Sequence, residues 1–238
     1  MRKILIAALA VVLICCGASE CSEMLSGVED VRVEYIKTDY QVLNVSSAIA
    51  VEYSSDSDMM EITADRDMLP YIDVKRTGNI LELKVRQNPF KNTGRIRVVL
   101  PVSGNLRWID LSGASSFKAS EKIYAPSFEL SLSGASKLDA EIETEKLQVD
   151  ASGASSLNIF GYADRMSIEA SGASRISSQS SRVSSDDIEV SVSGASRVCV
   201  DCTGSISGSI SGASSIIYGK NAKSVRISDS GASSARPE

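Results

Sequence analysis

The tetrapeptide Ser-Gly-Ala-Ser occurs seven times in the second half of the chain, and this repetition limits the folds that the chain can adopt. The spacings between successive copies are 21, 19, 19, 22, 18 and 19 residues. A period of roughly 20 residues with small slips is typical of a solenoid in which each repeat forms one turn. The motif glycines are Gly113, Gly134, Gly153, Gly172, Gly194, Gly212 and Gly231.

Apolar residues alternate with polar ones on both sides of each motif. In the third copy Leu147, Val149 and Ala151 precede Gly153, and Leu157 follows it. A period of two is typical of a β-strand with one buried face. Each copy therefore predicts a strand, a corner at the motif and a second strand. Stacking of the copies at about 4.8 Å gives every backbone amide a partner in the next coil, so we expect a parallel β-helix of about 20 residues per coil.

The motif itself fits a structural corner. Glycine permits the positive φ that a corner often requires. We expect the adjacent alanine to face inward, where consecutive coils are crowded, and the two serines to bond to their copies in the next coil. A serine surface that binds a ligand is the alternative.

The first half of the mature chain lacks the motif but shows the same alternation. We assign 28–105 to the opening coils and cap, and 106–238 to the repeat coils, of one β-helix domain; a separate small β-domain is the alternative. The segment Asp65–Leu69, which ends at Pro70, predicts one helical turn.

The first residues have the features of an export signal. Basic Arg2-Lys3 precedes an unbroken apolar segment, Ile4–Ile14, whose 11 residues are too few for the roughly 20 that span a bilayer. Leu13–Gly17 resembles a bacterial lipobox, apart from Cys15, and predicts a signal peptide over 1–16 with lipid attachment at Cys16.

Residues 17–27 then form a polar tether. Ordinary cleavage after the small-residue segment Cys16-Gly17-Ala18 is the alternative. Either route places the mature protein outside the cytoplasm, as an outer-membrane lipoprotein, on the cell surface or in the periplasm.

Composition excludes several functions. The chain contains no histidine, which excludes Ser-His-Asp and Cys-His catalysis and zinc sites with histidine ligands. Its net charge of −5 does not favour nucleic-acid binding. The pair Cys199 and Cys202 lacks the second pair that a zinc site needs; it predicts either a disulfide across a tight turn at Val200-Asp201 or two free thiols.

Acidic residues offer an enzymatic alternative. Asp110, Asp150 and Glu169 share one outward column, three residues before the motif glycine, and Trp108 has the same parity. Paired carboxylates hydrolyse glycosides, and an aromatic ring can stack on a sugar. Coils of this length leave no long loops to build a cleft, so we expect no enzymatic activity.

A calcium site is a weaker alternative. The acidic segments Ser54–Asp58 and Ser184–Asp187 fit loop tips better than calcium ligands, because glycine-aspartate nonapeptide repeats are absent. We therefore expect no metal and no cofactor.

The export signal, the alternating first half and the recurrent corners together resemble the putative auto-transporter adhesin, head GIN domain family, over about residues 28–235. The Gly-Ile-Asn signature of the family name is missing, and Ser47-Ala48-Ile49-Ala50 stands in its place. The resemblance implies an all-β fold, a single-stranded right-handed parallel β-helix. It implies a putative surface adhesin and specifies no binding residues.

We therefore expect an exported, non-enzymatic module for surface adhesion or envelope structure. Its expected partners are surface glycans or other cell-surface molecules, and outer-membrane lipid through the anchor. A carbohydrate-active lyase or glycosidase is one alternative. A self-assembling homo-oligomer is another, because Asp229 in a core column suggests that the last coil is frayed or covered by a partner.

Overall fold

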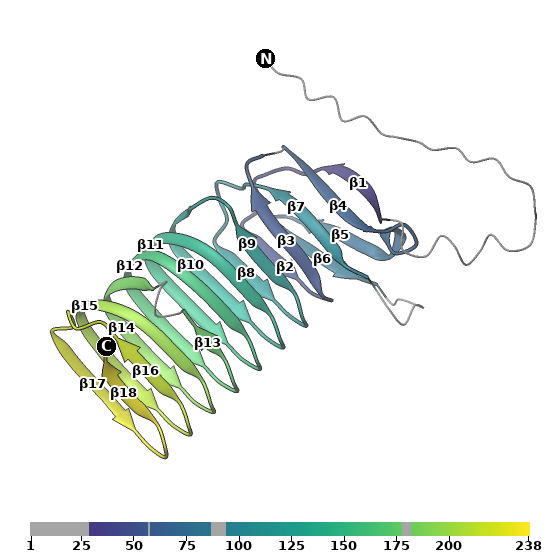
Figure 1. The fold of residues 1–238 in the computed structure, drawn as a ribbon. Helices are drawn as coiled ribbons and strands as arrows, with labels where there is room; N and C mark the ends of the chain where they lie inside the picture. The colour runs from purple at the N-terminus through teal and green to yellow at the C-terminus, as the bar shows by residue number, and fades with distance from the viewer. Residues whose placement is uncertain (1–28, 57, 87–93, 178–181) are drawn as a thin grey trace, which may run out of the picture.

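The computed structural model describes residues 29–56, 58–86, 94–177 and 182–238, which form a rod of stacked β-coils (Figure 1). Within these ranges the one helical element is a short 3-10 turn, η1 (Leu69–Tyr71). The strands are β1 (Glu29–Tyr35), β2 (Val42–Val45), β3 (Ile49–Ser54), β4 (Met59–Asp65), β5 (Ile72–Thr77), β6 (Ile80–Val85), β7 (Ile96–Pro101), β8 (Trp108–Leu111), β9 (Ser116–Ala119), β10 (Ile123–Leu132), β11 (Lys137–Ala151), β12 (Ser156–Ala170), β13 (Arg175–Ile176), β14 (Val183–Val192), β15 (Arg197–Ile210), β16 (Ser215–Tyr218), β17 (Ser224–Asp229) and β18 (Ser234–Pro237).

Successive coils pair in parallel and in register. Leu130 of β10 lies beside Val149 of β11, and Val149 lies beside Ile168 of β12, which lies beside Val190 of β14. All four side chains are buried in one continuous core. The predicted parallel β-solenoid is confirmed, and the alternating apolar residues form its interior.

The motif glycines lie in single file along one edge of the rod. Each has a positive φ, from 71° at Gly134 to 81° at Gly231. The amide of Ala154 donates to the carbonyl of Gly134 at 2.7 Å, and equivalent bonds join the other copies. The corners therefore stack as directly as the strands do.

The side chains at each corner are placed differently from the prediction. The alanine of the motif is exposed, as at Ala154, and the second serine is buried, as at Ser155. The Ser155 hydroxyl donates to the carbonyl of Ser152 in its own corner at 2.7 Å, not to a serine of the next coil. The same bond within the corner forms at Ser115, Ser136, Ser174 and Ser233.

The first half continues the same stack of coils but is not wound in chain order. Strand β2 pairs in parallel with β6 on one side and with β8 on the other, and β3 lies likewise between β7 and β9. The coil formed by β6 and β7 therefore lies outside the earlier coil of β2 and β3. Antiparallel strands extend the end of the rod, β5 beside β6 and β4 between β7 and β1.

A buried network of hydrogen bonds fixes this junction. The Tyr53 hydroxyl donates to the Ser103 carbonyl at 2.7 Å and accepts from the Ser103 amide at 2.6 Å. The Ser103 hydroxyl donates to the Tyr40 carbonyl at 2.6 Å. Burial raises the pKa of Tyr53 to about 12. The network satisfies polar groups that would otherwise be costly inside the core.

The predicted helical turn lies further along the chain than expected. Met68 donates its amide to Asp65, and the 3-10 turn then covers Leu69–Tyr71 and includes Pro70. Proline is tolerated there because the first positions of a helix need no amide donor. In the described ranges, no helix has the length and apolar character needed to cross a membrane. The predicted signal peptide, lipid site at Cys16 and tether lie outside the described residues.

Candidate functional site

Two exposed tyrosines lie on alternate coils at the edge of the rod where β10, β11 and β12 bend. Tyr124 lies beside Glu143, and Glu143 lies beside Tyr162. Tyr124 is 64% exposed and Tyr162 is 37% exposed. We call Lys122, Tyr124, Glu143, Tyr162 and Asp164 the tyrosine patch. Two coil steps separate its rings by about 9.6 Å along the rod.

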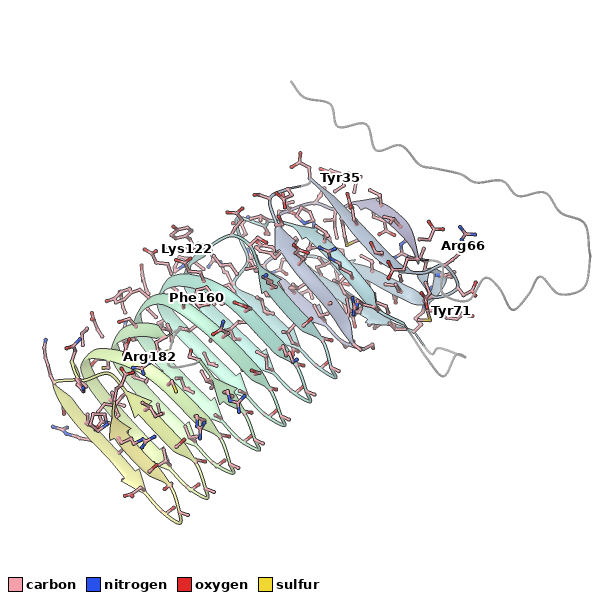
Figure 2. The ribbon with its side chains drawn as sticks, viewed as in Figure 1. Tyr35, Arg66, Tyr71, Lys122, Phe160 and Arg182 are labelled. Atoms are coloured by element: carbon pink, nitrogen blue, oxygen red, sulfur yellow. The ribbon has the colours of Figure 1, made fainter. Side chains whose placement is uncertain are left out.

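Charged neighbours hold the tyrosine patch in place. Lys122 bonds to Glu141 at 2.8 Å and to Glu143 at 3.3 Å, and its ammonium lies 5.8 Å from the Tyr124 ring centroid. The hydrogen bond to Glu141, followed by the one to Glu143, raises the pKa of Lys122. A hydrogen bond to Asp186 raises the pKa of Tyr162. Figure 2 shows Lys122 on the same long side of the rod as Phe160, which pairs with Glu141.

Three shallow hollows follow one another around the outside of the same coils. The first, of about 450 Å³, is lined by four residues of the tyrosine patch, all but Lys122, together with Ala125, Pro126, Thr144 and Glu145. The second begins at the next residues, Ser127, Lys146 and Arg165, and measures about 440 Å³. The third, of about 330 Å³, lies further along the same strands and includes Asp150 and Glu169. Together they make a long, open surface of mixed polar and apolar character.

Two of the three carboxylates considered for catalysis lie in this third hollow. Asp150 and Glu169 are neighbours in register on β11 and β12, as the column alignment predicted. The hollow is otherwise lined by serines and by small core residues. Asp150 accepts a hydrogen bond from the Gln148 side chain at 3.0 Å. The two carboxylates share one face of a sheet and do not oppose each other across a cleft, as glycoside hydrolysis requires.

Asp110 and Trp108 lie on β8, at the N-terminal side of the same sheet. Trp108 is 38% exposed and pairs with Glu129 of β10, while Asp110 pairs with Ser131. Partial burial raises the pKa of Asp110. Burial, followed by repulsion from Asp150, raises the pKa of Glu129. Ser131 thus separates Asp110 from Asp150, and the column does not bring all three predicted carboxylates together.

Cys199 and Cys202 are free, buried thiols. Strand β15 runs unbroken through Cys199 and Cys202, so the tight turn that a disulfide would need is absent. Their pKa values are raised, chiefly by burial. The structure therefore corresponds to the free-thiol alternative.

The acidic segments do not gather metal ligands. Asp186 accepts from the Thr203 hydroxyl at 2.6 Å, and Asp187 accepts from the Ser205 amide at 3.1 Å. Near the first segment Ser54 donates to Asp56 at 2.7 Å. Over the described ranges, no group of three or more acidic or cysteine side chains is placed to hold a metal ion.

Several solved structures share this fold. A putative adhesin from Bacteroides fragilis aligns with a TM-score of 0.80 and 17% identity, over 90% of this chain and 99% of that chain. A putative adhesin from Parabacteroides distasonis gives 0.68 and 18%, over 88% and 98%. A putative lipid binding protein from the same species gives 0.66 and 18%, over 89% and 97%. These identities establish the fold alone.

A search of curated proteins finds no match. The model of the family described as putative auto-transporter adhesin, head GIN domain, matches residues 39–222, which is most of the chain. That range includes both the cap region from β2 onward and the stacked corners up to the sixth motif. The chain therefore belongs to the putative auto-transporter adhesin, head GIN domain family.

Proposed function

We propose that this protein is an exported, non-enzymatic surface adhesin that binds glycans through the tyrosine patch and the adjoining hollows. The observation that carries the proposal is the pair of exposed rings, Tyr124 and Tyr162, on alternate coils beside acceptor and donor groups. Aromatic faces pack against the apolar faces of sugar rings, and carboxylates accept bonds from their hydroxyls. Weak contacts at several sites give useful avidity on a cell surface.

The shape of the surface favours binding over turnover. The hollows are shallow and lie side by side along the coils, which suits an extended chain molecule. A glycosidase needs two carboxylates on opposite sides of the scissile bond. Here Asp150 and Glu169 lie on adjacent strands of one face, so they support hydrogen bonding to a sugar better than acid–base attack on it.

Replacing Tyr124 with alanine is expected to weaken glycan binding about tenfold, because the most exposed ring of the patch is lost. The measurement is a glycan array probed with the exported protein, followed by titration of the best ligand. The double variant Tyr124→Ala/Tyr162→Ala should bind no glycan detectably.

Val225→Ala is the control, because Val225 of β17 is also an exposed apolar residue but lies outside the tyrosine patch and the three hollows. It should bind like the unaltered protein. Equal binding by Tyr124→Ala, Tyr162→Ala and Val225→Ala would contradict the proposed site. Turnover of a polysaccharide that is abolished by Asp150→Ala or Glu169→Ala would instead support the enzymatic alternative.

The anchor belongs to the same proposal. Cys16→Ser is expected to move the protein from the membrane fraction to the soluble exported fraction, because the lipidated thiol is removed. Mass spectrometry of the N-terminal peptide should show the lipid on the unaltered chain only. Cys21→Ser is the control and should leave the protein in the membrane. A Cys16→Ser variant that stays in the membrane fraction would refute lipid attachment at this residue.

A further inference from the structure

Strand β1 has a reversed pattern of exposure. Its outward residues Val31, Val33 and Tyr35 are apolar and are 52%, 53% and 73% exposed. The residues between them, including Arg32 and Glu34, are charged and partly buried. A contiguous group of exposed apolar side chains commonly marks an interaction surface. The exposed face of β1 is therefore a candidate interaction surface.

The backbone of β1 is also open to pairing. It pairs antiparallel with β4 over all seven residues, without a bulge. Among the described residues no strand pairs with its other edge, and Figure 1 shows it at the N-terminal end of the rod. Natural edge strands are commonly blocked by proline, lysine or a bulge. Strand β1 has none of these, and its two inward-facing charges, Arg32 and Glu34, already pair with each other.

The sequence of β1 is complementary to itself in one register. We propose that two copies of this protein pair through β1, antiparallel, about a two-fold axis at Val33. This register places Val33 opposite the partner's Val33 and Val31 opposite the partner's Tyr35. It also places Arg32 opposite the partner's Glu34. Apolar and opposite-charge pairs of this kind each contribute about 0.2–1 kcal/mol.

Neighbouring symmetric registers are worse matched. An axis at Arg32 places two arginines opposite each other and Asp30 opposite Glu34, so like charges meet. An axis at Val31 places Glu29 opposite Val33 and shortens the paired segment. Like charges directly opposite each other destabilise a sheet. An axis at Val31 also places Asp30 opposite Arg32, but of the three registers only the axis at Val33 gives apolar or opposite-charge pairs over all five residues Val31–Tyr35.

Contacts within its own chain fix the position of Arg32. Its guanidinium donates to the carbonyls of Leu69 at 2.9 Å and Ile72 at 3.1 Å, and its Nε lies 2.9 Å from Glu34. In the dimer two arginines and two glutamates would alternate across the axis. The two rods would join at their N-terminal ends and double the number of tyrosine patches. That consequence for avidity rests on the proposed function, whereas the pairing does not.

Cysteine cross-linking of the full chain in the cell envelope tests the register. Val33→Cys, in a Cys21→Ser background, should give mostly covalent dimer on mild copper-catalysed oxidation, because opposed residues lie within disulfide reach. Val31→Cys alone should give at least fivefold less dimer, since its copies lie about 13 Å apart along the strand. The double variant Val31→Cys/Tyr35→Cys should restore the dimer. The natural Cys199 and Cys202 are buried.

Two controls separate pairing from chance collision. Tyr124→Cys is a comparably exposed position away from β1 and should cross-link at least fivefold less than Val33→Cys. Adding Glu34→Arg to Val33→Cys places like charges opposite each other and should also lower the dimer at least fivefold. Equal yields from Val33→Cys and Tyr124→Cys would overturn the proposal. So would a Val33→Cys protein that is exported and folded but neither cross-links nor reacts with a maleimide, since β1 would then be covered by another segment.

Discussion

Gly153→Val is expected to cost about 4 kcal/mol or more of the free energy of unfolding, a large part of the stability of a typical domain. A Cβ at this position would lie 2.5 Å from the carbonyl oxygen of Gly134. That oxygen accepts the amide of Ala154 at 2.7 Å, so the corner would have to open and lose the bond. The φ of +72° adds about 1–2 kcal/mol of strain for an L-residue.

Gly78→Val separates the two causes. Gly78 has a similar φ of +62° in the turn between β5 and β6, but a Cβ there would meet nothing within 4 Å. Its loss should be about 1–2 kcal/mol, from backbone strain alone. Urea unfolding followed by circular dichroism measures both variants. Equal losses would mean that close stacking of the corners contributes nothing to stability.

The stacked corners were predictable because the motif glycine recurs every 18 to 22 residues. The orientation of the corner side chains was predicted wrongly, although the alternation of inward and outward positions around each glycine gives it correctly. Residues two, four and six before Gly153 face inward, and so does Leu157 four after it; Ser155 at two after has the same parity and is buried. The polarity of serine led to the opposite expectation. A serine is tolerated inside because its hydroxyl finds a carbonyl within its own corner.

The tyrosine patch was missed for a different reason. Counted back from the next motif glycine, Tyr124, Glu143 and Tyr162 all lie ten residues before it, which is an inward parity. They face outward because each coil bends a second time, within β10, β11 and β12. Two consecutive residues are exposed at this bend, as Asp164 and Arg165 are, and this reverses the alternation. Counting backward from each glycine would have aligned Tyr124, Glu143 and Tyr162 in one column. Strict alternation would still have predicted that this column faces the core.

The order of the opening coils could not be predicted from the sequence. Strands β2 and β6 have similar alternation, and nothing in their residues indicates which lies next to the repeat coils. The order depends on long-range contacts, such as the bonds between Tyr53 and Ser103, which are 50 residues apart. The sequence left two alternatives for Cys199 and Cys202, a disulfide across a tight turn or two free thiols, for the same reason. Pairing of this strand with the neighbouring coils determines which of the two forms.

Ile168→Ala is expected to lower the free energy of unfolding by about 3–4 kcal/mol. Ile168 is fully buried, and its neighbours in register are Val149 on one side and Val190 on the other. Backbone hydrogen bonds fix the spacing of the coils, so these neighbours cannot close the cavity that the lost side chain leaves. The loss of unfolding free energy should therefore exceed the transfer free energy of the removed side-chain atoms, because the cavity adds to it.

Ile227→Ala is the matched control, because Ile227 has the same place in the last coil, beside Gly208 of β15, and is only partly buried. Its loss should be about 1 kcal/mol or less, since the removed atoms already contact solvent. Denaturant titration of the two variants measures the difference. A solenoid gains stability from interfaces between neighbouring coils, so a central coil with two interfaces must be worth more than the last described coil with one. Equal losses at the two positions would contradict that account of the core.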